Sequence, residues 1–349
     1  MDTNINNPKI SVIIPTCNRP ELLYQAVQSI LNQSFQNFEI IVVDDGLEKR
    51  ADKIIEKIND DRIVYIKHEK NKGASAARNT GIKKARGEYL ILLDDDDTSF
   101  QKRLKIQNKF MDKNSKIGVA GSWAQIIEKT RSKKYIKPIS NPKKIKTMLL
   151  FGCPIINPSV IFRRKLLNKY NLEYITKLKL SEDYDLWTRI IKYSQITNIK
   201  KILIQYRIHG SNISKTHSKI QKQNSTKIKI NQLRNYLNIN PTDEEILIHE
   251  NIHKPNQYEI NDFLKKEENW LTNLIEQNQK TKFYNEPEFS QVLSQRWLQI
   301  CSINSNHNWK IWNKFWKSSL KRKLDLREWE TWKLLIRFFF KCFIKKPQK

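Results

Sequence analysis

Cysteine is scarce in this sequence, and long apolar runs are absent. The four cysteines, Cys17, Cys153, Cys301 and Cys342, lie far apart and form no Cys-x-x-Cys pair. This spacing argues against a disulfide framework and a zinc site, and it fits a reducing compartment. No stretch of about 18 uninterrupted apolar residues occurs, so no membrane-spanning helix is expected. The polar residues 1–7 contain no apolar signal segment, so we expect a cytoplasmic protein.

Two nucleotide-binding fingerprints are also missing. No Gly-x-Gly-x-x-Gly follows the first predicted strand, and no Walker A sequence occurs. Dehydrogenases and P-loop enzymes are therefore disfavoured as function classes. Any bound phosphate would have to be held by a metal ion and by basic side chains instead.

Acidic residues are too few to balance the basic ones. The 349 residues carry a formal net charge of +28, with 39% hydrophobic and 10% aromatic residues. This charge predicts attraction to a polyanion, which could be an anionic membrane, a nucleic acid or a phosphorylated substrate. The length predicts two domains, or one domain with an extension.

The first part of the chain alternates between predicted strands and helices. Residues 9–15, 38–43, 63–67 and 90–93 are short apolar or β-branched runs typical of buried strands. Predicted helices at about 20–33 and 51–58, and one following residues 71–81, separate these runs. Such alternation predicts a parallel sheet covered by helices.

Polar and acidic residues follow three of these strands. They are Asn18 and Arg19, then Asp44 and Asp45, then the four acids from Asp94 to Asp97. The carboxyl ends of parallel strands meet at one edge, where nucleotides bind. Four adjacent carboxylates repel one another, and Mg²⁺ or Mn²⁺ would remove that repulsion. The alternatives are a solvated acidic turn after Leu93 and a simple Asp-Asp-Gly turn.

The motifs, taken in order, resemble the family 2 glycosyltransferases of the GT-A fold. The resemblance covers about residues 8–215. Its motifs are Ser11-Val12-Ile13-Ile14-Pro15-Thr16-x-Asn18-Arg19, Val42-Val43-Asp44-Asp45-Gly46, Gly73 with Arg78-Asn79, Gly87-Glu88-Tyr89-x-x-x-Leu93-Asp94-x-Asp96-Asp97, Asn157-Pro158-Ser159-Val160-Ile161-Phe162-Arg163-Arg164, Ser181-Glu182-Asp183-Tyr184-Asp185-Leu186-Trp187-x-Arg189 and Tyr206-Arg207-x-His209-x-x-x-x-Ser214.

The resemblance implies a fold and two regions. The fold is an α/β, Rossmann-like GT-A sheet, mixed but mostly parallel and flanked by helices. Residues 1–215 would form the catalytic domain, and residues 216–349 would form a helical, basic, aromatic-rich C-terminal region.

The implied activity is metal-dependent sugar transfer with inversion. A nucleoside-diphosphate sugar, expected to be a UDP-hexose, would donate to a hydroxyl of a glycolipid or polysaccharide precursor. Asp96 would bind Mn²⁺ or Mg²⁺, with Asp94 and Asp95 holding ribose or ion and Asp97 supporting them. His209 would be a further metal ligand, although a loop histidine is as readily a surface residue.

Further residues are assigned to the nucleotide. Asp45 resembles the residue that accepts hydrogen bonds from the ring N–H of the base. Pro15, Thr16, Asn18 and Arg19 would line the same pocket, and Arg78 would pair with base or phosphate. Two departures from the family leave the ribose side open: Leu47-Glu48-Lys49 follows Gly46, and Asp95 occupies a position where relatives often carry a small residue.

The expected general base is Asp183, next to Glu182. Both acids begin a predicted helix whose buried face would carry Leu186, Ile190 and Tyr193. Acids in a first helical turn also stabilise the helix dipole, by a few tenths to about 1 kcal/mol, so capping alone is the alternative. Tyr184 and Trp187 would face the acceptor or pack in the core.

The C-terminal 49 residues hold 13 Lys or Arg against 3 Asp or Glu. Aromatic and basic residues form separate helical faces there, first around 309–321 and again around 329–345. This arrangement is typical of a helix lying in an anionic membrane surface. The alternatives are a helical hairpin packed on the catalytic domain and a dimer contact. We expect peripheral association with the inner face of the cell membrane.

Two other functions compete with sugar transfer. A nucleic-acid binder would use the basic charge with aromatic stacking platforms, but phosphodiesters would be repelled by the acidic rim, so no nucleic-acid partner is expected. A nucleotidyltransferase would use the same acids and metal, and would release pyrophosphate. The sequence does not identify the sugar, the acceptor or the linkage.

Overall fold

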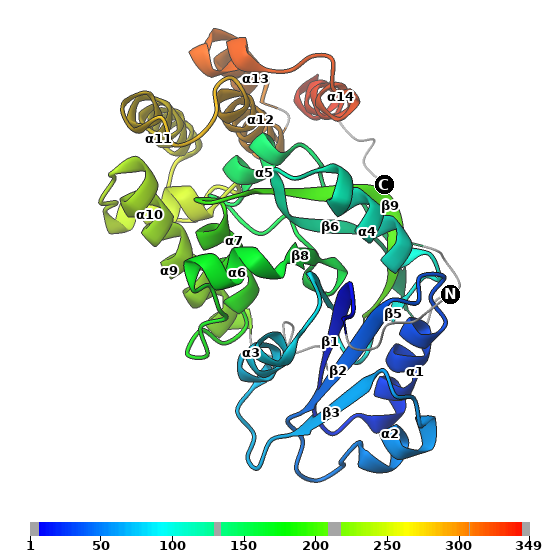
Figure 1. The fold of residues 1–349 in the computed structure, drawn as a ribbon. Helices are drawn as coiled ribbons and strands as arrows, with labels where there is room; N and C mark the ends of the chain where they lie inside the picture. Colours follow the sequence, from blue (N-terminus) through cyan, green and yellow to red (C-terminus); the bar gives the residue numbers. More distant parts are fainter. Residues whose placement is uncertain (1–6, 129–133, 209–217, 307, 344–349) are drawn as a thin grey trace, which may run out of the picture. The chain divides into compact units, whose positions relative to one another are not determined.

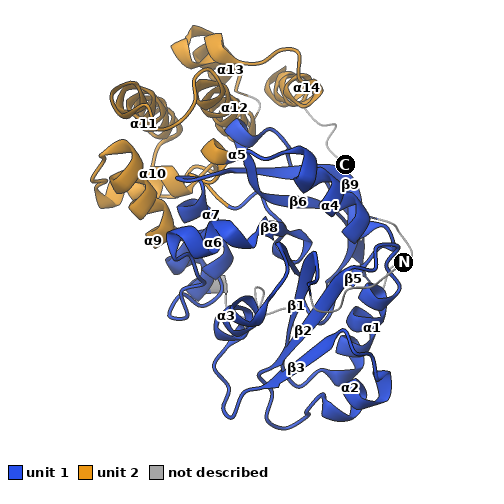
Figure 2. Ribbon diagram, in the orientation of Figure 1, with its two compact units in different colours: residues 1–145, 153–225 blue, residues 146–152, 226–349 orange. Residues whose placement is uncertain are grey.

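The computed structural model describes residues 7–128, 134–208, 218–306 and 308–343. The chain divides into two compact units (Figure 2). The first unit comprises residues 1–145 and 153–225, and the second comprises residues 146–152 and 226–349.

The first unit is organised around one mixed sheet (Figure 1). Its strands are β1 (Ile10–Thr16), β2 (Phe38–Asp44), β3 (Ile63–Lys67), β4 (Tyr89–Leu92), β5 (Thr98–Ser99), β6 (Ile117–Ile127), β7 (Lys134–Ile136), β8 (Ile161–Arg163) and β9 (Gln195–Arg207). The order is β3-β2-β1-β4-β8-β6-β9-β5, with β7 paired to β6. Strands β1 to β4 run parallel, as do β6 and β9, while β8 is antiparallel to β4 and β6. The predicted mixed, mostly parallel sheet is confirmed.

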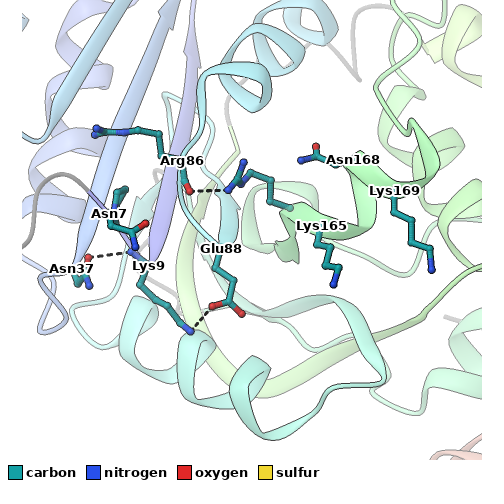
Figure 3. A pocket seen from close by; sticks show the side chains of 10 residues that line it. Asn7, Lys9, Asn37, Arg86, Glu88, Lys165, Asn168 and Lys169 are labelled. Atoms are coloured by element: carbon teal, nitrogen blue, oxygen red, sulfur yellow. Dashed lines mark hydrogen bonds and ion pairs between the residues drawn. The ribbon is translucent and has the colours of Figure 1, made fainter.

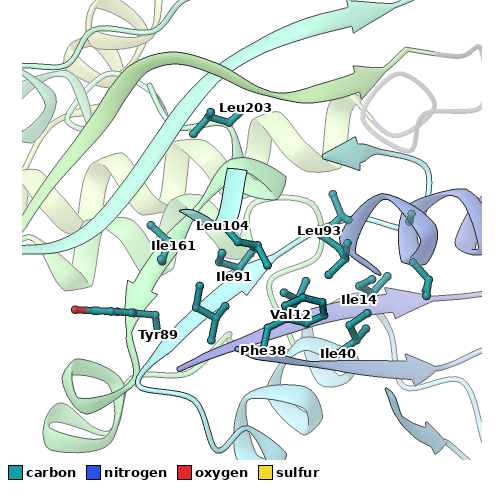
Figure 4. Packing of buried hydrophobic residues seen from close by; sticks show 14 of the residues in the cluster. Val12, Ile14, Phe38, Ile40, Tyr89, Ile91, Leu93, Leu104, Ile161 and Leu203 are labelled. Carbon is teal, nitrogen blue, oxygen red and sulfur yellow. The ribbon is translucent and has the colours of Figure 1, made fainter. Parts of the chain in front are cut away.

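Burial explains why the central strands are continuous apolar runs. All seven residues of β2 and all four of β4 are buried, as expected for parallel strands covered on both faces. The edge strand β3 is only half-buried. Side chains from the three inner strands form one core, in which Val12, Ile14, Ile40, Ile91 and Leu93 pack together (Figure 4).

Helices cover the sheet. They are α1 (Pro20–Leu31), α2 (Asp52–Ile58), α3 (Ala74–Lys84), α4 (Arg103–Lys113), α6 (Arg164–Tyr170) and α7 (Glu182–Ile190), with a short 3-10 turn η1 (Asn157–Ser159). Helix α1 begins with Pro20. Proline suits this position because an N–H in the first turn has no acceptor within the helix, so its absence costs no hydrogen bond. Leu23, Val27 and Ile30 of α1 are buried at helical spacing. Helices α5 (Pro142–Met148) and α9 (Ser218–Leu237) each contribute residues to both units.

The second unit is helical in its described part. Its remaining elements are α10 (Asp243–Glu250), α11 (Ile260–Thr281), α12 (Glu288–Ile303), α13 (Trp309–Lys317), the 3-10 turn η2 (Ser319–Lys323) and α14 (Trp329–Phe343). Helix α12 is the central helix of this unit, because α11, α13, η2 and α14 all pack against it. Across the described residues, no helix combines the length and the apolar character needed to cross a bilayer.

Candidate active site

The four consecutive acids form a tight turn after β4. The N–H of Asp97 donates to the carbonyl of Asp94 at 3.1 Å, and β5 follows directly. Because β1, β2 and β4 are parallel neighbours, this turn and the segments after Thr16 and Asp44 lie at the same edge of the sheet. That edge is where ligands bind in open α/β sheets.

Arg78 of α3 connects the acidic turn to α7. Its Nη2 donates to Asp94 Oδ1 at 3.0 Å, and its Nη1 donates to Glu182 Oε1 at 2.8 Å. Burial lowers the pKa of Arg78, but the charges of Asp94 and Glu182 outweigh this and leave the pKa above its ordinary value. The guanidinium also lies 5.6 Å from the centre of the Tyr174 ring. In this structure Arg78 pairs with protein carboxylates, and its contact with base or phosphate stays a prediction.

The end of β1 supports the middle of the turn. Thr16 Oγ1 donates to Asp95 Oδ2 at 2.8 Å. Arg19 Nη1 lies 3.1 Å from Asp96 Oδ2 and 3.4 Å from Asp95 Oδ1. Burial raises the pKa of Asp95 to about 6, although the hydroxyl of Thr16 and the charge of Arg19 oppose this. The structure therefore brings two expected nucleotide-binding residues against the expected ribose and metal acids.

Arg207, which the motifs include without a role, holds the end of the turn. Its N–H donates to Asp97 Oδ1 at 2.8 Å, and its Nε donates to the carbonyl of Asp96 at 2.9 Å. Burial raises the pKa of Asp97 to about 9, and Asp94 adds to the shift. Asp97 Oδ2 is buried and lacks a hydrogen-bond partner among the residues described. One buried carboxylate oxygen of the turn is therefore left without a hydrogen-bond donor among the described residues.

Arg103 was not identified from the sequence. It is completely buried, and its Nη2 donates to the carbonyls of Leu92 and Pro158, both at 2.9 Å. Its other nitrogens donate to Gln107 and Ser99 at 3.0 Å. A guanidinium stays protonated in proteins, so Arg103 places a fixed positive charge beneath the acidic turn. No local sequence signal distinguishes this arginine from others on helices.

Asp45 lies at the same edge but is occupied by protein groups. Its Oδ1 contacts His68 Nδ1 at 2.7 Å and accepts from the N–H of Lys72 at 2.8 Å. Its Oδ2 accepts from the N–H of Gly73 at 2.7 Å. Gly73 has φ of +87°, a conformation that favours glycine. Hydrogen bonding from Asp45 to a base stays a prediction, and His68 is a neighbour that sequence reasoning missed.

Asn18 and Pro15 lie at the carboxyl end of β1. Asn18 has φ of +57°, and its Oδ1 accepts hydrogen bonds from the N–H groups of Glu48 and Lys49 at 3.2 and 3.1 Å. It thereby orders the segment that departs from the family pattern. Pro15 pairs with Val43 in the register between β1 and β2.

The expected base, Asp183, lines a cavity of about 320 Å³ together with Asp94, Arg78 and Glu182. Burial raises the pKa of Asp183 to about 6, and the charge of Glu182 adds to the shift. The N–H of Tyr184 donates to Asp183 Oδ1 at 2.7 Å. The structure therefore places the acidic turn and the expected base in one cavity.

In the segment around Asp183, the structure corrects the predicted burial of Tyr193 and shows where Tyr184 and Trp187 lie. Leu186 and Ile190 are buried as predicted, but α7 ends at Ile190, and Tyr193 beyond it is 46% exposed. Tyr193 stacks on Tyr170 with ring centres 3.9 Å apart. Tyr184 and Trp187 are both buried in the core.

Leu180, just before α7, is a further feature that the sequence did not reveal. It lines the cavity with φ of +69°, a strained conformation for a leucine, and such strain concentrates at functional sites.

The acidic turn provides ligands suited to a hard divalent cation. In the ranges that the structure describes, no three His, Cys, Asp or Glu side chains are grouped to hold a metal ion. His209 lies outside those ranges. Mg²⁺ in phosphate-transfer sites is commonly held by one or two carboxylates together with substrate phosphates. The unpartnered oxygen of Asp97 fits such a cation.

Comparisons with known proteins agree with this geometry. The family model for glycosyl transferase family 2 matches residues 11–173. A Methanocaldococcus jannaschii protein named as an uncharacterized glycosyltransferase is 37% identical over 226 residues, covering 63% of this chain and 77% of that protein. A glycosyltransferase of Rickettsia bellii, also named as uncharacterized, is 35% identical over 208 residues, which are 60% of this chain and only 30% of that protein.

Two further comparisons carry more specific names. Escherichia coli WfgD, named as a UDP-Glc:alpha-D-GlcNAc-diphosphoundecaprenol beta-1,3-glucosyltransferase, is 31% identical over 216 residues, covering 61% of this chain and 83% of that protein. The crystal structure of S. aureus TarS 1-349 in complex with UDP-GlcNAc matches with a TM-score of 0.54 at 18% identity, covering 86% of this chain and 84% of that one. At this identity the match shows the GT-A-like fold alone. On the sequence relatives and the family model, the chain belongs to glycosyltransferase family 2.

Proposed function

We propose that this enzyme transfers a sugar, with inversion, from a UDP-sugar to an acceptor hydroxyl, with residues 1–215 as its catalytic domain. The observation that carries the proposal is the shared cavity of Asp94 and Asp183, with Arg78 between Asp94 and Glu182. A donor-binding acid and a candidate base on one cavity are what direct displacement requires.

Asp183 is proposed as the general base. Glu182 is paired with Arg78, whereas Asp183 has no cationic partner among the described residues. The acceptor O–H bond breaks and its proton passes to the Asp183 carboxylate as the oxygen attacks the anomeric carbon. The new C–O bond forms while the bond to the diphosphate breaks, so the nucleoside diphosphate leaves with the electron pair and the configuration inverts.

Asp96 is proposed to bind Mn²⁺ or Mg²⁺, with His209 as the further ligand that the resemblance implies and Asp94 holding ribose or ion. A bound cation supplies charge stabilisation for the leaving diphosphate. Two arginines outside the turn orient these carboxylates: Arg19 holds Asp96, and Arg78 holds Asp94. Asp95 and Asp45 are proposed to face the ribose and base, together with Pro15, Thr16 and Asn18.

The nucleotide and acceptor are proposed from the relatives. The name of WfgD includes UDP-Glc, which supports a UDP-hexose as the donor. WfgD is named for a diphosphoundecaprenol-linked acceptor, which supports a lipid-linked acceptor here.

The second unit is proposed to hold the enzyme on the inner face of the cell membrane. Of fifteen exposed large apolar side chains in the described part of the chain, nine lie in residues 309–343. They are Trp309, Trp316, Leu326, Trp329, Trp332, Ile336, Phe339, Phe340 and Phe343. Helix α14 buries a different face, which carries Leu335, Phe338 and Cys342. The aromatics, interleaved with basic residues, suit an anionic lipid surface.

The test is a donor screen that measures release of nucleoside diphosphate with Mn²⁺ present. A UDP-sugar should be turned over by the wild type. Asp183→Asn and Asp96→Ala should lose turnover, while Asp52→Asn, a surface change on α2, should retain it. Turnover that survives Asp183→Asn would refute the assigned base, and release of pyrophosphate would indicate a nucleotidyltransferase instead.

A further inference from the structure

A second cavity, of about 770 Å³, lies at the edge of the sheet where the parallel strands begin (Figure 3). Lys9 and Glu88 immediately precede β1 and β4, and Arg164, Lys165 and Lys169 come from α6. The seven residues of β1 separate this edge from the acidic turn, a distance of roughly 20 Å at the usual rise per residue. The cavity is therefore separate from the proposed active site.

Some of the charges around this cavity are neutralised within the protein. Lys9 Nζ lies 2.6 Å from Glu88 and 3.2 Å from Asp112. Arg86 Nη2 lies 2.8 Å from Glu39. These two cations therefore have three carboxylates, and they contribute no net positive charge to the cavity.

The three cations of α6 are not neutralised. Arg164, Lys165 and Lys169 form no ion pair with any carboxylate in the described ranges. Arg164 Nε donates to the carbonyl of Gly87 at 2.7 Å, and its Nη2 donates to the carbonyl of Arg86 at 3.0 Å, so the guanidinium plane is fixed. Lys165 and Lys169 are exposed, lie one helical turn apart and project to the same side (Figure 3).

We propose that this cavity binds a phosphate-bearing ligand. Like charges one turn apart destabilise a helix by a few tenths of a kcal/mol. Lys169 Nζ lies 5.2 Å from the centre of the Tyr170 ring, a contact that leaves the positive charge of the lysine in place. An anion with two or more negative charges would remove the repulsion between Lys165 and Lys169. A guanidinium held in a fixed plane also suits phosphate oxygens geometrically. Asn168, between the two lysines on the cavity wall, adds a neutral hydrogen-bonding group.

Calorimetric titration of the full chain with pyrophosphate, in EDTA, tests the proposal. EDTA removes divalent cations, so that the diphosphate is not bound through metal at the acidic turn. The wild type should bind pyrophosphate at a saturable site, and the double variant Lys165→Ala/Lys169→Ala should bind at least tenfold more weakly. Binding should also weaken as salt increases. Equal affinity of the two proteins for pyrophosphate would exclude a soluble phosphate compound as the ligand.

The matched control is Lys53→Ala/Lys57→Ala on α2. These lysines are also exposed, one turn apart and in the first unit, so the change in net charge is identical. This control should bind pyrophosphate within twofold of the wild-type affinity. If both double variants lost affinity equally, the loss would come from the lower net charge of the protein, and the specific site would be refuted. Asp96→Ala should keep pyrophosphate binding in EDTA, which separates this site from the proposed catalytic function.

A vesicle-binding experiment distinguishes a lipid headgroup from a soluble phosphate compound as the ligand. Phosphatidylcholine vesicles with and without phosphatidic acid are compared for binding to the same two double variants, both of which keep α13 and α14. A loss confined to Lys165→Ala/Lys169→Ala on phosphatidic acid identifies a lipid headgroup as the ligand. A loss seen only with pyrophosphate identifies a soluble phosphate compound. No effect in either arm overturns the proposal.

Discussion

Arg78 donates a hydrogen bond of 2.8 Å to Glu182, although 104 residues separate the two in the chain. The same guanidinium holds Asp94 at 3.0 Å, so one side chain joins the acidic turn to the first turn of α7. Glu182 is thereby committed to an ion pair. Asp183, its neighbour, is left as the carboxylate without a cation on the cavity wall.

Replacing Arg78 should damage both stability and activity. Arg78→Met leaves two carboxylates, only 13% and 28% exposed, without their cation. Loss of one partner from such a buried network should lower the free energy of unfolding by about 3 kcal/mol. Urea denaturation measures this, alongside UDP release. Lys83→Met on the same helix is the control, because Lys83 is 75% exposed, and it should change stability by less than about 1 kcal/mol.

Activity should fall on the acid side of about pH 6. Burial, with the charge of Glu182, raises the pKa of Asp183 to about 6, and a general base must be ionised to accept a proton. The rate should therefore decrease tenfold per pH unit below that value. In Glu182→Gln one negative charge is lost, so the acid limb should move to lower pH. Rate profiles of both proteins measure this, and superimposable limbs would contradict the assignment.

The contribution of Glu267 to the free energy of unfolding should decrease as pH rises, whereas the contribution of a carboxylate in a salt bridge increases. This α11 residue is fully buried, neither carboxylate oxygen has a hydrogen-bond partner among the described residues, and burial raises its pKa to about 8. The folded protein therefore retains a proton that the unfolded chain releases above its ordinary pKa of 4.5. Stability from this group is full below that value and is lost as pH rises through about 8.

The comparison with Glu267→Gln isolates this effect. Between about pH 5 and pH 8.5, the wild type should lose about 2–4 kcal/mol of unfolding free energy relative to the variant, measured by urea denaturation. Glu268→Gln is the control, because that neighbouring carboxylate is partly exposed and lies 3.7 Å from Lys314. Parallel pH profiles for the wild type and Glu267→Gln would show that Glu267 is ionised in the fold.

Removing Arg103 should distort the acidic turn from beneath. Arg103→Lys keeps the charge but cannot hold the carbonyls of Leu92 and Pro158 together with Ser99 and Gln107. Buried acceptors then lose their donors, at about 1–3 kcal/mol each. We expect kcat to fall at least tenfold with the UDP-sugar found in the screen. Lys102→Arg, one residue earlier at the helix start, should leave kcat unchanged, and retained activity in Arg103→Lys would contradict a positioning role.

Membrane binding should depend on the exposed aromatics of α14. The variant Trp332→Ser/Phe339→Ser/Phe340→Ser should reduce partitioning onto anionic vesicles by at least about tenfold, because apolar burial contributes about 25 cal/mol per Å². Vesicle co-sedimentation measures this. Tyr24→Ser/Tyr135→Ser/Tyr193→Ser removes three comparably exposed aromatics from the first unit and should change nothing. Equal binding by all three proteins would exclude α14 as the contact.

The tail shows a packed face that helical periodicity alone did not identify. On a wheel, Trp309, Trp312, Trp316 and Leu320 share a face of the predicted helix. In the structure α13 ends at Lys317 and buries Ile311 and Phe315 instead, while Trp309 and Trp316 stay exposed. Apolar residues lie on both sides of the basic face of this segment, so periodicity cannot select the side that packs. The contacts of α13 with α12 and α14 make that choice.

The sequence by itself determined the parallel half of the sheet, the acidic turn and the family. Strands buried on both faces must be continuous apolar runs, and the turn that follows such a run lies at a defined edge. Strand β3 occupies the predicted residues, β2 extends one residue beyond the prediction, and β1 and β4 are each shifted from it by one residue. These features are local, so they can be recognised from neighbouring residues.

Only the tertiary structure decided the partners of the polar side chains. Arg78 reaches Glu182, Arg103 reaches the carbonyl of Pro158, and Asp45 contacts His68. His68 and the buried Arg103 have no distinguishing local pattern. A hydrogen bond depends on two groups meeting within about 3 Å at a favourable angle, and the packing of distant segments sets that geometry.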